Sequence, residues 1–406
     1  MYSGCMRPYK STLSPIRVPN QFIKRATNLK ICYAIVEIVE GVGQTTMLGQ
    51  ILQFESQRYQ SAIVTHRVQK YTPTLFKDSD IQVSNSYYTS LVNSGLVEYF
   101  KKFDIVVIKS GLPFFLAALK SKVPTIYVLH QPDPVLWFSG RARLNRLAAR
   151  LLERPILLKH ADAFISVSPW VAKWYKDHFN IDSVVIPDSF DLSVFRPTRI
   201  VDSNESFGRP MRLLCVGSWD GFGGRKRTHE LIDFLPNLRK RYQGASLSLV
   251  GLSETGLMEL RSYANKIGAS EGLILKGKLS VEALAKEYNS ADIYVTATMI
   301  EGFYRPIIEA FACGLPAVAR DTSGLFDSVC LATLHHLRAS EAGVLYDGSE
   351  KSFIDAISSV MSQHEKMAEN AIKYAKQFDN SKVIQKYYDL FEKVLSKYRE
   401  FRADRT

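Results

Sequence analysis

The feature that most constrains the fold is an alternation of short apolar runs and amphipathic stretches, which occurs in two series along the chain. The apolar runs of the first series lie at 31–36, 62–65, 105–108, 125–129 and 163–167, and those of the second at 212–216, 246–250, 273–276, 293–297 and 316–319. Continuous runs rich in Val and Ile are typical of parallel strands that are buried on both faces. Strands that alternate with helices predict two doubly wound α/β domains in tandem.

Residues 188–210 interrupt this alternation with a polar stretch that contains Pro and Gly, as expected of a linker. We therefore expect four parts: a flexible basic arm at 1–29, a Rossmann-like domain at 30–200, a second one at 201–380, and a helix at 381–406 that packs back on the first domain. Parallel sheets bind ligands beyond the carboxyl ends of their strands. A site in the cleft between the two domains is the expected consequence.

Composition narrows the class of protein. The 406 residues carry 52 Lys and Arg against 40 Asp and Glu, a net charge of +12, which indicates an anionic partner. The five cysteines are an odd number and form no CxxC pair, which favours reduced thiols in a cytoplasmic protein over a zinc site or a disulfide framework. No apolar run reaches the roughly 18 residues of a transmembrane helix.

The strongest motif is EGFYRPIIEAFACGLPAVA at 301–319. Glu301 follows a predicted strand, and Glu309 falls in a helix that starts near Pro306, where proline suits the first turn. Carboxylates accept strong hydrogen bonds, including from the vicinal hydroxyls of sugars and ribose. The pair predicts a site for such a ligand. The alternative is two solvated glutamates that favour the positive end of a helix.

A second motif is the glycine-rich loop GSWDGFGG at 217–224, followed by Arg225 and Lys226 and by a predicted helix at 228–238. Flexible backbone and cations at a helix start are suited to bind phosphate. The alternative is a basic, solvated helix start.

Three weaker signals each have an alternative explanation. His130 ends a predicted strand and is expected to face the cleft, although a lone histidine is usually structural. Gly41 and Gly43 form a candidate acceptor-side loop after the first strand, or a plain turn. Asp78 and Asp80 mimic a metal-binding DxD motif in a short match expected by chance, so no metal ligand is predicted.

Residues 141–159 form a predicted basic amphipathic helix, with Arg143, Arg146, Arg150 and Arg154 on one side. This helix either packs on the core with a solvated basic face or contacts an anionic membrane peripherally.

The motif at 301–319 resembles the E-x7-E motif of retaining GT-B glycosyltransferases of family 4, the glycosyl transferases group 1. This resemblance implies a GT-B fold with two Rossmann-like domains facing a cleft. It also implies transfer of a sugar from a nucleotide-sugar donor to a hydroxyl of a glycan, lipid-linked or protein-linked acceptor. Retention of anomeric configuration is implied, with neither a metal nor another cofactor.

The resemblance also assigns roles to residues. Glu301 is expected to contact the donor sugar, Glu309 the ribose, and Lys226 the diphosphate, while His130 lies near the reacting sugar. The family arginine is replaced here by Ser218, so Arg225 is expected to substitute for it. The remaining donor-binding candidates are Gly217, Gly302, Phe303, Tyr304 and Arg305. The last two residues stand where the family usually has Gly-Leu.

Two alternatives stay open at this point. Nucleotide-sugar epimerases and glycoside phosphorylases reuse the same two-domain plan. A non-catalytic nucleic-acid-binding protein would explain the positive charge. The basic residues are nevertheless spread along the chain and no RNP-like aromatic motif occurs, so nucleic acid is not an expected partner.

Overall fold

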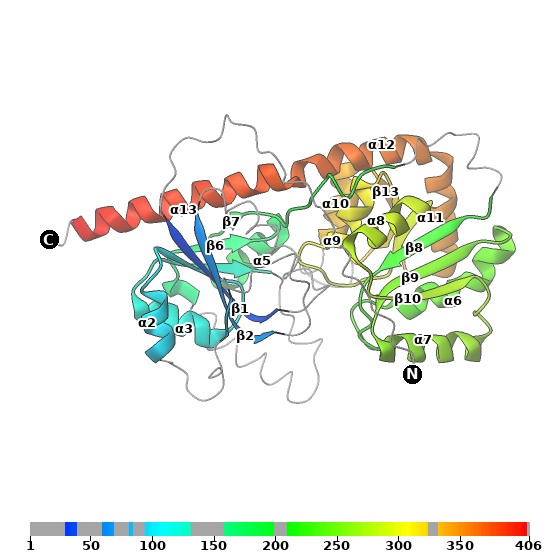
Figure 1. The fold of residues 1–406 in the computed structure, drawn as a ribbon. Coiled ribbons are helices and arrows are strands. Elements are labelled where there is room, and N and C mark those ends of the chain that lie inside the picture. The colour runs from blue at the N-terminus through cyan, green and yellow to red at the C-terminus, as the bar shows by residue number, and fades with distance from the viewer. Residues whose placement is uncertain are drawn as a thin grey trace, which may run out of the picture.

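A computed structural model describes residues 29–38, 59–68, 81–83, 94–130, 158–198, 209–323 and 332–403. These residues form two parallel sheets, each flanked by helices (Figure 1). The doubly wound α/β architecture predicted from the sequence is confirmed.

The N-terminal sheet has the strand order β3-β2-β1-β4-β5-β6-β7, with every neighbouring pair parallel. Its strands are β1 (Lys30–Ile38), β2 (Gln60–Val68), β3 (Ile81–Val83), β4 (Ile105–Ile108), β5 (Thr125–Leu129), β6 (Ala163–Ser166) and β7 (Val184–Val185). The helices described in this half are α2 (Ser94–Phe100), α3 (Leu112–Ser121), the short 3-10 helix η5 (Leu158–His160) and α5 (Pro169–Phe179).

The C-terminal sheet repeats this plan with the order β10-β9-β8-β11-β12-β13. Its strands are β8 (Arg212–Val216), β9 (Ser246–Leu252), β10 (Leu273–Gly277), β11 (Ile293–Thr296), β12 (Ala317–Arg320) and β13 (Gly343–Tyr346). Its helices are α6 (Thr228–Arg241), α7 (Glu254–Ile267), α8 (Val281–Ser290), α9 (Arg305–Ala312), α10 (Ala332–Ser340), α11 (Glu350–Ser362) and α12 (His364–Ala375), followed by the 3-10 helix η6 (Lys376–Phe378).

All ten predicted apolar runs are strands, and their ends differ from the prediction by at most three residues. The prediction missed β3, β7 and β13. These strands are two to four residues long, and most of their side chains are only partly buried or exposed. A short strand at the edge of a sheet lacks the continuous apolar run by which the central strands are recognised.

The strand order reverses between β1 and β4 in the first sheet and between β8 and β11 in the second. At such a switch point, the loops that leave the two neighbouring strands diverge and open a crevice at their carboxyl ends. The glycine-rich loop after β8 and the Glu301 loop after β11 therefore start side by side.

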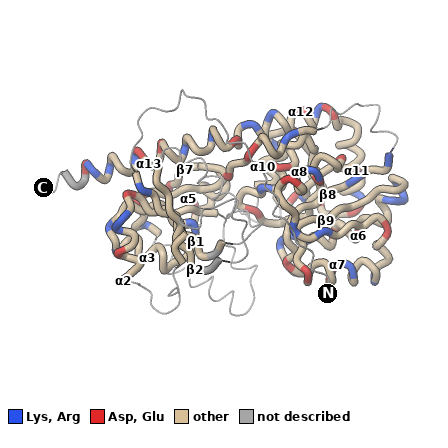
Figure 2. The backbone as a smooth tube through the Cα atoms, in the orientation of Figure 1, with Lys and Arg blue, Asp and Glu red and all other residues tan. Residues whose placement is uncertain are grey.

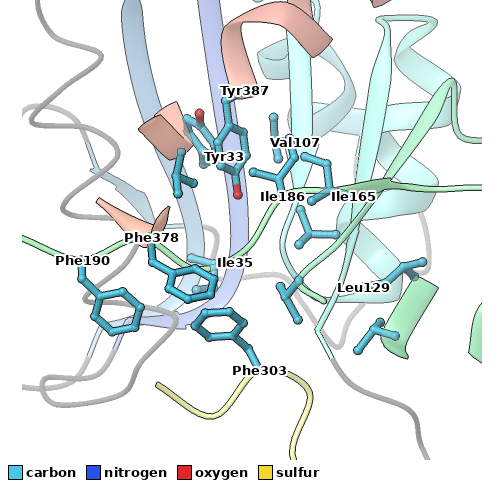
Figure 3. Packing of buried hydrophobic residues seen from close by; sticks show 14 of the residues in the cluster. Tyr33, Ile35, Val107, Leu129, Ile165, Ile186, Phe190, Phe303, Phe378 and Tyr387 are labelled. Carbon is cyan, nitrogen blue, oxygen red and sulfur yellow. The ribbon is translucent and has the colours of Figure 1, made fainter. Parts of the chain in front are cut away.

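The last helix, α13 (Asn380–Ala403), returns from the C-terminal half and runs along the N-terminal sheet (Figure 1). Its buried residues Tyr387 and Phe391 belong to the same hydrophobic cluster as Tyr33 of β1, and Tyr387 lies beside Tyr33 in Figure 3. The hydroxyl of Tyr398 donates a hydrogen bond to the carbonyl of Lys122. The two halves of the protein are thus joined twice, by the segment after β7 and by the start of α13.

Several sequence predictions lie outside the described residues. These are the arm at 1–28, the Gly41 and Gly43 loop, the Asp78 and Asp80 pair, and most of the basic helix at 141–159. Among the described residues, no helix is both long and apolar enough to cross a bilayer. Along the backbone of both halves, the positions of Lys and Arg are intermixed with those of Asp and Glu, as Figure 2 shows.

Candidate functional site

The candidate site lies where β8 and β11 end, at the switch point of the C-terminal sheet. The loop after β8 contributes Arg225 and Lys226, and the loop after β11 contributes Thr298 and Glu301. Two of the hydrogen bonds between these loops end on backbone carbonyls: the Met299 amide donates to the Arg225 carbonyl (2.8 Å), and Arg225 Nη1 donates to the Ile300 carbonyl (3.1 Å).

Glu301 is the centre of this cluster. Its Oε1 accepts hydrogen bonds from Arg225 Nη1 (2.6 Å), Lys226 Nζ (2.5 Å) and Thr298 Oγ1 (3.1 Å). The side chains of Glu301 and Lys226 are each only 11% exposed. Burial alone would raise the pKa of Glu301, but the charges of Lys226 and Arg225 outweigh it and hold the pKa of this carboxyl below its usual value. Glu301 is therefore an ionised carboxylate held between two cations.

The glycine-rich loop fixes the backbone that carries these cations. Both oxygens of Asp220 accept a hydrogen bond from the Lys226 amide, at 3.3 and 3.4 Å. A Cβ atom at Gly224 would lie 2.5 Å from the backbone carbonyl oxygen of Asp220, so this turn accepts no larger residue there without moving. Gly217 packs against the Lys226 side chain, to which a Cβ atom would be 3.8 Å away.

The residues that follow Glu301 are held by the other half of the protein. Ser168, which caps α5 in the N-terminal half, donates from Oγ to the Gly302 carbonyl at 2.6 Å. The ring of Phe303 packs against Phe190, in the segment after β7, and against Phe378, next to α13 (Figure 3). Ser168, at the turn between β6 and α5, thus makes an interdomain contact.

His336 of α10 also contacts the loop that follows Glu301. Its ring nitrogens contact the Phe303 carbonyl (Nε2, 2.7 Å) and the Tyr374 hydroxyl (Nδ1, 3.0 Å). Because a carbonyl only accepts, Nε2 carries the proton. Burial lowers the pKa of His336 to about 3, so the ring is neutral at physiological pH.

Tyr304 and Arg305 are also turned into the protein. The Tyr304 hydroxyl lies 2.8 Å from the Tyr294 hydroxyl and 2.6 Å from Thr296 Oγ1, and the whole residue is 4% exposed. Arg305 donates from Nη1 to the Ser189 carbonyl at 3.0 Å, and its guanidinium lies 4.2 Å from the centre of the Phe190 ring.

Glu309 belongs to a different hydrogen-bonded group from Glu301. Its Oε2 accepts a hydrogen bond from the Tyr288 hydroxyl at 3.0 Å, and its Oε1 lies 3.6 Å from Arg305 Nη2. Burial raises the pKa of Glu309, and the charge of Arg305 offsets this only in part. The two glutamates of the motif thus occupy opposite electrostatic environments.

His130 lies just beyond the carboxyl end of β5. Its Nε2 is buried without a hydrogen-bond partner in the described part of the chain. Burial, together with the charge of Lys109, lowers the pKa of His130 to about 3, which keeps the imidazole neutral. Lys109, itself 1% exposed, and Asp188 are also buried. Burial raises the pKa of Asp188, and the charges of Arg305 and Lys109 offset this in part.

Sequence reasoning missed Lys109, Asp188, Thr298 and Tyr288. Lys109 carried a usable signal, because a lysine directly after the apolar run of β4 must be buried or lie at the end of the strand. Of the predicted site residues, the structure brings together Glu301, Arg225, Lys226 and Gly217. Glu309 is in the neighbouring buried group, and Gly41 and Gly43 are outside the described residues.

Comparison with known proteins gives two family matches that divide the chain between them. The model of the Glycosyl transferases group 1 family matches residues 202–378, and that of Glycosyltransferase Family 4 matches residues 54–194. The boundary between the two matches falls in the predicted linker. Together they span most of the chain.

Two curated relatives are similar over part of the chain. A D-inositol 3-phosphate glycosyltransferase of Nocardiopsis dassonvillei is 28% identical over 194 residues, 45% of each chain. A GDP-mannose-dependent alpha-(1-6)-phosphatidylinositol monomannoside mannosyltransferase of Mycobacterium tuberculosis is 25% identical over 188 residues, 43% of this chain and 46% of that one. The matched region spans about half the length of these relatives.

Among solved structures, Anabaena Alr3699/HepE in complex with UDP-glucose shares the fold, with a TM-score of 0.72 at 17% identity. The match covers 90% of this chain and 100% of the Anabaena chain.

The opposite environments of the two glutamates predict opposite pH trends in stability. The folded-state pKa of Glu301 is below its ordinary 4.5, so its ionised form stabilises the fold at neutral pH, and this contribution is lost as the pH falls through the folded pKa. The folded-state pKa of Glu309 is above 4.5, so its ionisation costs stability as the pH rises through it. Glu301→Gln should therefore be more destabilising at neutral pH than below pH 4.5. Glu309→Gln should instead be less destabilising at neutral pH than below pH 4.5.

The free energy of unfolding in denaturant, measured for both variants at neutral pH and below pH 4.5, checks this. Glu365→Gln, at an exposed position on α12, is the control for a general effect of the substitution. Trends of the same sign for both variants would contradict the two environments.

Proposed function

The chain belongs to the group 1, family 4 glycosyltransferases, and we propose that it transfers a sugar from a nucleoside-diphosphate sugar to a hydroxyl acceptor. The observation that carries this proposal is the cluster of Arg225, Lys226 and Glu301 at the ends of β8 and β11. Two cations and an ionised carboxylate at a switch point offer one partner for phosphates and another for sugar hydroxyls.

The cations act on the leaving group. Negative charge develops on the nucleoside diphosphate as the bond to the sugar breaks, and a fixed ammonium and guanidinium stabilise that charge. Both side chains are held by Glu301 before the donor arrives. A diphosphate offers them a second anionic partner, which leaves carboxylate lone pairs of Glu301 available to the hydroxyls of the sugar.

The remaining steps follow the family pattern. His130, a neutral imidazole with an available Nε2, positions the sugar from the opposite half. We propose attack on the same face of the sugar as the leaving group, with retention, and with a donor phosphate oxygen taking the acceptor proton. No side chain is assigned as a covalent nucleophile, and the cationic side chains take the place of a metal ion at the phosphates.

Glu309 is proposed to bind the ribose, as its place in the motif suggests. Its carboxylate is engaged by Tyr288 and lies near Arg305. To bind Glu309, the ribose hydroxyls must then replace the 3.6 Å contact between Glu309 Oε1 and Arg305 Nη2.

The acceptor is proposed to be a polyhydroxylated molecule, free or lipid-linked. The names of the two curated relatives refer to an inositol phosphate and to a phosphatidylinositol mannoside. Family membership favours transfer over epimerisation or phosphorolysis, and nucleic acid binding is not retained as a function.

A thermal-shift screen identifies the donor, because a ligand that binds only the folded state raises the melting temperature. We expect one of UDP, GDP and ADP, and the corresponding nucleotide sugar, to do so. With that donor, turnover should persist in excess EDTA, and NMR of the first-formed product should show the anomeric configuration of the donor. Inversion, or activity that returns only with added Mg²⁺ or Mn²⁺, would contradict the proposed mechanism.

Calorimetry with the nucleoside diphosphate separates the roles of the site residues. A charged hydrogen bond is worth about 1.5–3 kcal/mol, or roughly tenfold to a hundredfold in affinity. Lys226→Met and Glu309→Gln should each weaken binding by about this factor, because the diphosphate and the ribose are both present in this ligand. Glu301→Gln should change it by less than about threefold while lowering kcat, because Glu301 is assigned to the sugar.

Arg209→Met, which breaks an ion pair with Asp292 outside the site, is the control for lost charge. Equal losses in Glu301→Gln and Glu309→Gln would place both carboxylates on the nucleotide. If Lys226→Met lost no affinity for the nucleoside diphosphate, the diphosphate would not bind at this cluster.

A further inference from the structure

Tyr304 adopts a backbone conformation that its side chain disfavours. Its φ is +67° and its ψ is +66°, in the left-handed region that glycine adopts freely and a bulky residue rarely does. Four other described residues besides glycine have a positive φ, namely Lys122, Asn180, Arg227 and Glu341, and none of these is buried. Tyr304 is therefore a strained residue in the interior, and such strain persists only where the surroundings enforce it.

The surroundings of Tyr304 fix its ring in one place. The hydroxyl is within hydrogen-bond distance of both Tyr294 and Thr296, on the strand that leads into the loop. The ring is covered on one face by the ammonium of Lys226, which lies 5.1 Å from the ring centre. Tyr304 is only 4% exposed, so its ring packs behind Lys226 and is not open to a ligand.

Lys226 is consequently held on two sides. The Glu301 carboxylate binds its ammonium from one direction, and the Tyr304 ring attracts it from another. A lysine side chain has four flexible carbons, and ordering it on a ligand normally costs conformational entropy. An ammonium that is already fixed avoids most of that cost when it binds a phosphate.

We propose that Tyr304 is a positioning residue that fixes the ammonium of Lys226 for the donor diphosphate. The inference rests on the proposed function, because it takes Lys226 to be the diphosphate ligand. The strained tyrosine is retained because glycine, although free of strain at this position, would remove the ring on which the ammonium rests.

A double-mutant cycle with calorimetry tests this proposal. Tyr304→Gly should weaken the nucleoside diphosphate about tenfold while changing the affinity of the nucleoside alone by less than about twofold, given the usual strength of a desolvated cation–π contact. Tyr304→Phe keeps the ring and should stay within about threefold of the wild type. In a Lys226→Met background, Tyr304→Gly should have no further effect, because its action passes through the lysine.

Two controls keep the test independent of folding and of catalysis. Tyr346→Ala removes a buried ring from the other hydrophobic cluster of the same half and should lower stability without a loss specific to the diphosphate. With ¹³C-labelled lysine, NMR should show a ring-current shift of the Lys226 ε-methylene protons in the wild type and Tyr304→Phe that is absent in Tyr304→Gly. This signal needs no ligand.

The outcomes separate the two proposals. If Tyr304→Gly weakened the nucleoside and the diphosphate equally, or acted fully in the Lys226→Met background, the positioning role would be overturned. If the ring-current shift behaved as expected but the wild type bound no nucleoside diphosphate, the proposed function would fail while the contact between Tyr304 and Lys226 would stand. If the wild type showed no ring-current shift, the contact between the Tyr304 ring and Lys226 would be contradicted.

Discussion

The connection from β11 to α9, residues 301–305, is the constraint on which the site depends, because each of its residues is tied to a different part of the protein. Glu301 binds the glycine-rich loop, Gly302 accepts from Ser168 of the N-terminal half, and Phe303 packs between the two segments that cross from one half to the other. Tyr304 is tied to β11, and Arg305 to the segment after β7. A shift of one half relative to the other therefore acts directly on the loop that carries Glu301.

Electrostatics divides this small region into two environments. Glu301 has two cations within hydrogen-bond distance, so its ionised form is favoured even though it is nearly buried. Glu309 has one cation at longer range and a neutral hydroxyl, so burial dominates and raises the pKa of this carboxyl above its usual value. Two glutamates eight residues apart thus differ because of their partners and not because of their depth. Sequence spacing alone cannot reveal such a difference.

The sequence predicted the central strands and the site loops well because both have local signatures. Apolar runs identify β8 and β11, and the glycines, the cations and Glu301 follow them directly, so parallel topology was enough to bring these residues together. The edge strands were missed because they are short and half exposed. The buried roles of Tyr304 and Arg305 were missed because the sequence shows a departure from the family pattern without showing which way the side chains turn.

A crystal structure of the chain with its nucleotide-sugar donor tests the central claim most directly. The account predicts that the diphosphate lies beyond the ends of β8 and β11, within hydrogen-bond distance of Arg225 and Lys226, with Glu301 on a hydroxyl of the sugar. The Tyr304 ring should remain beneath Lys226. A diphosphate bound at the end of β1 and β4, or at any place where Lys226 does not contact it, would contradict the account.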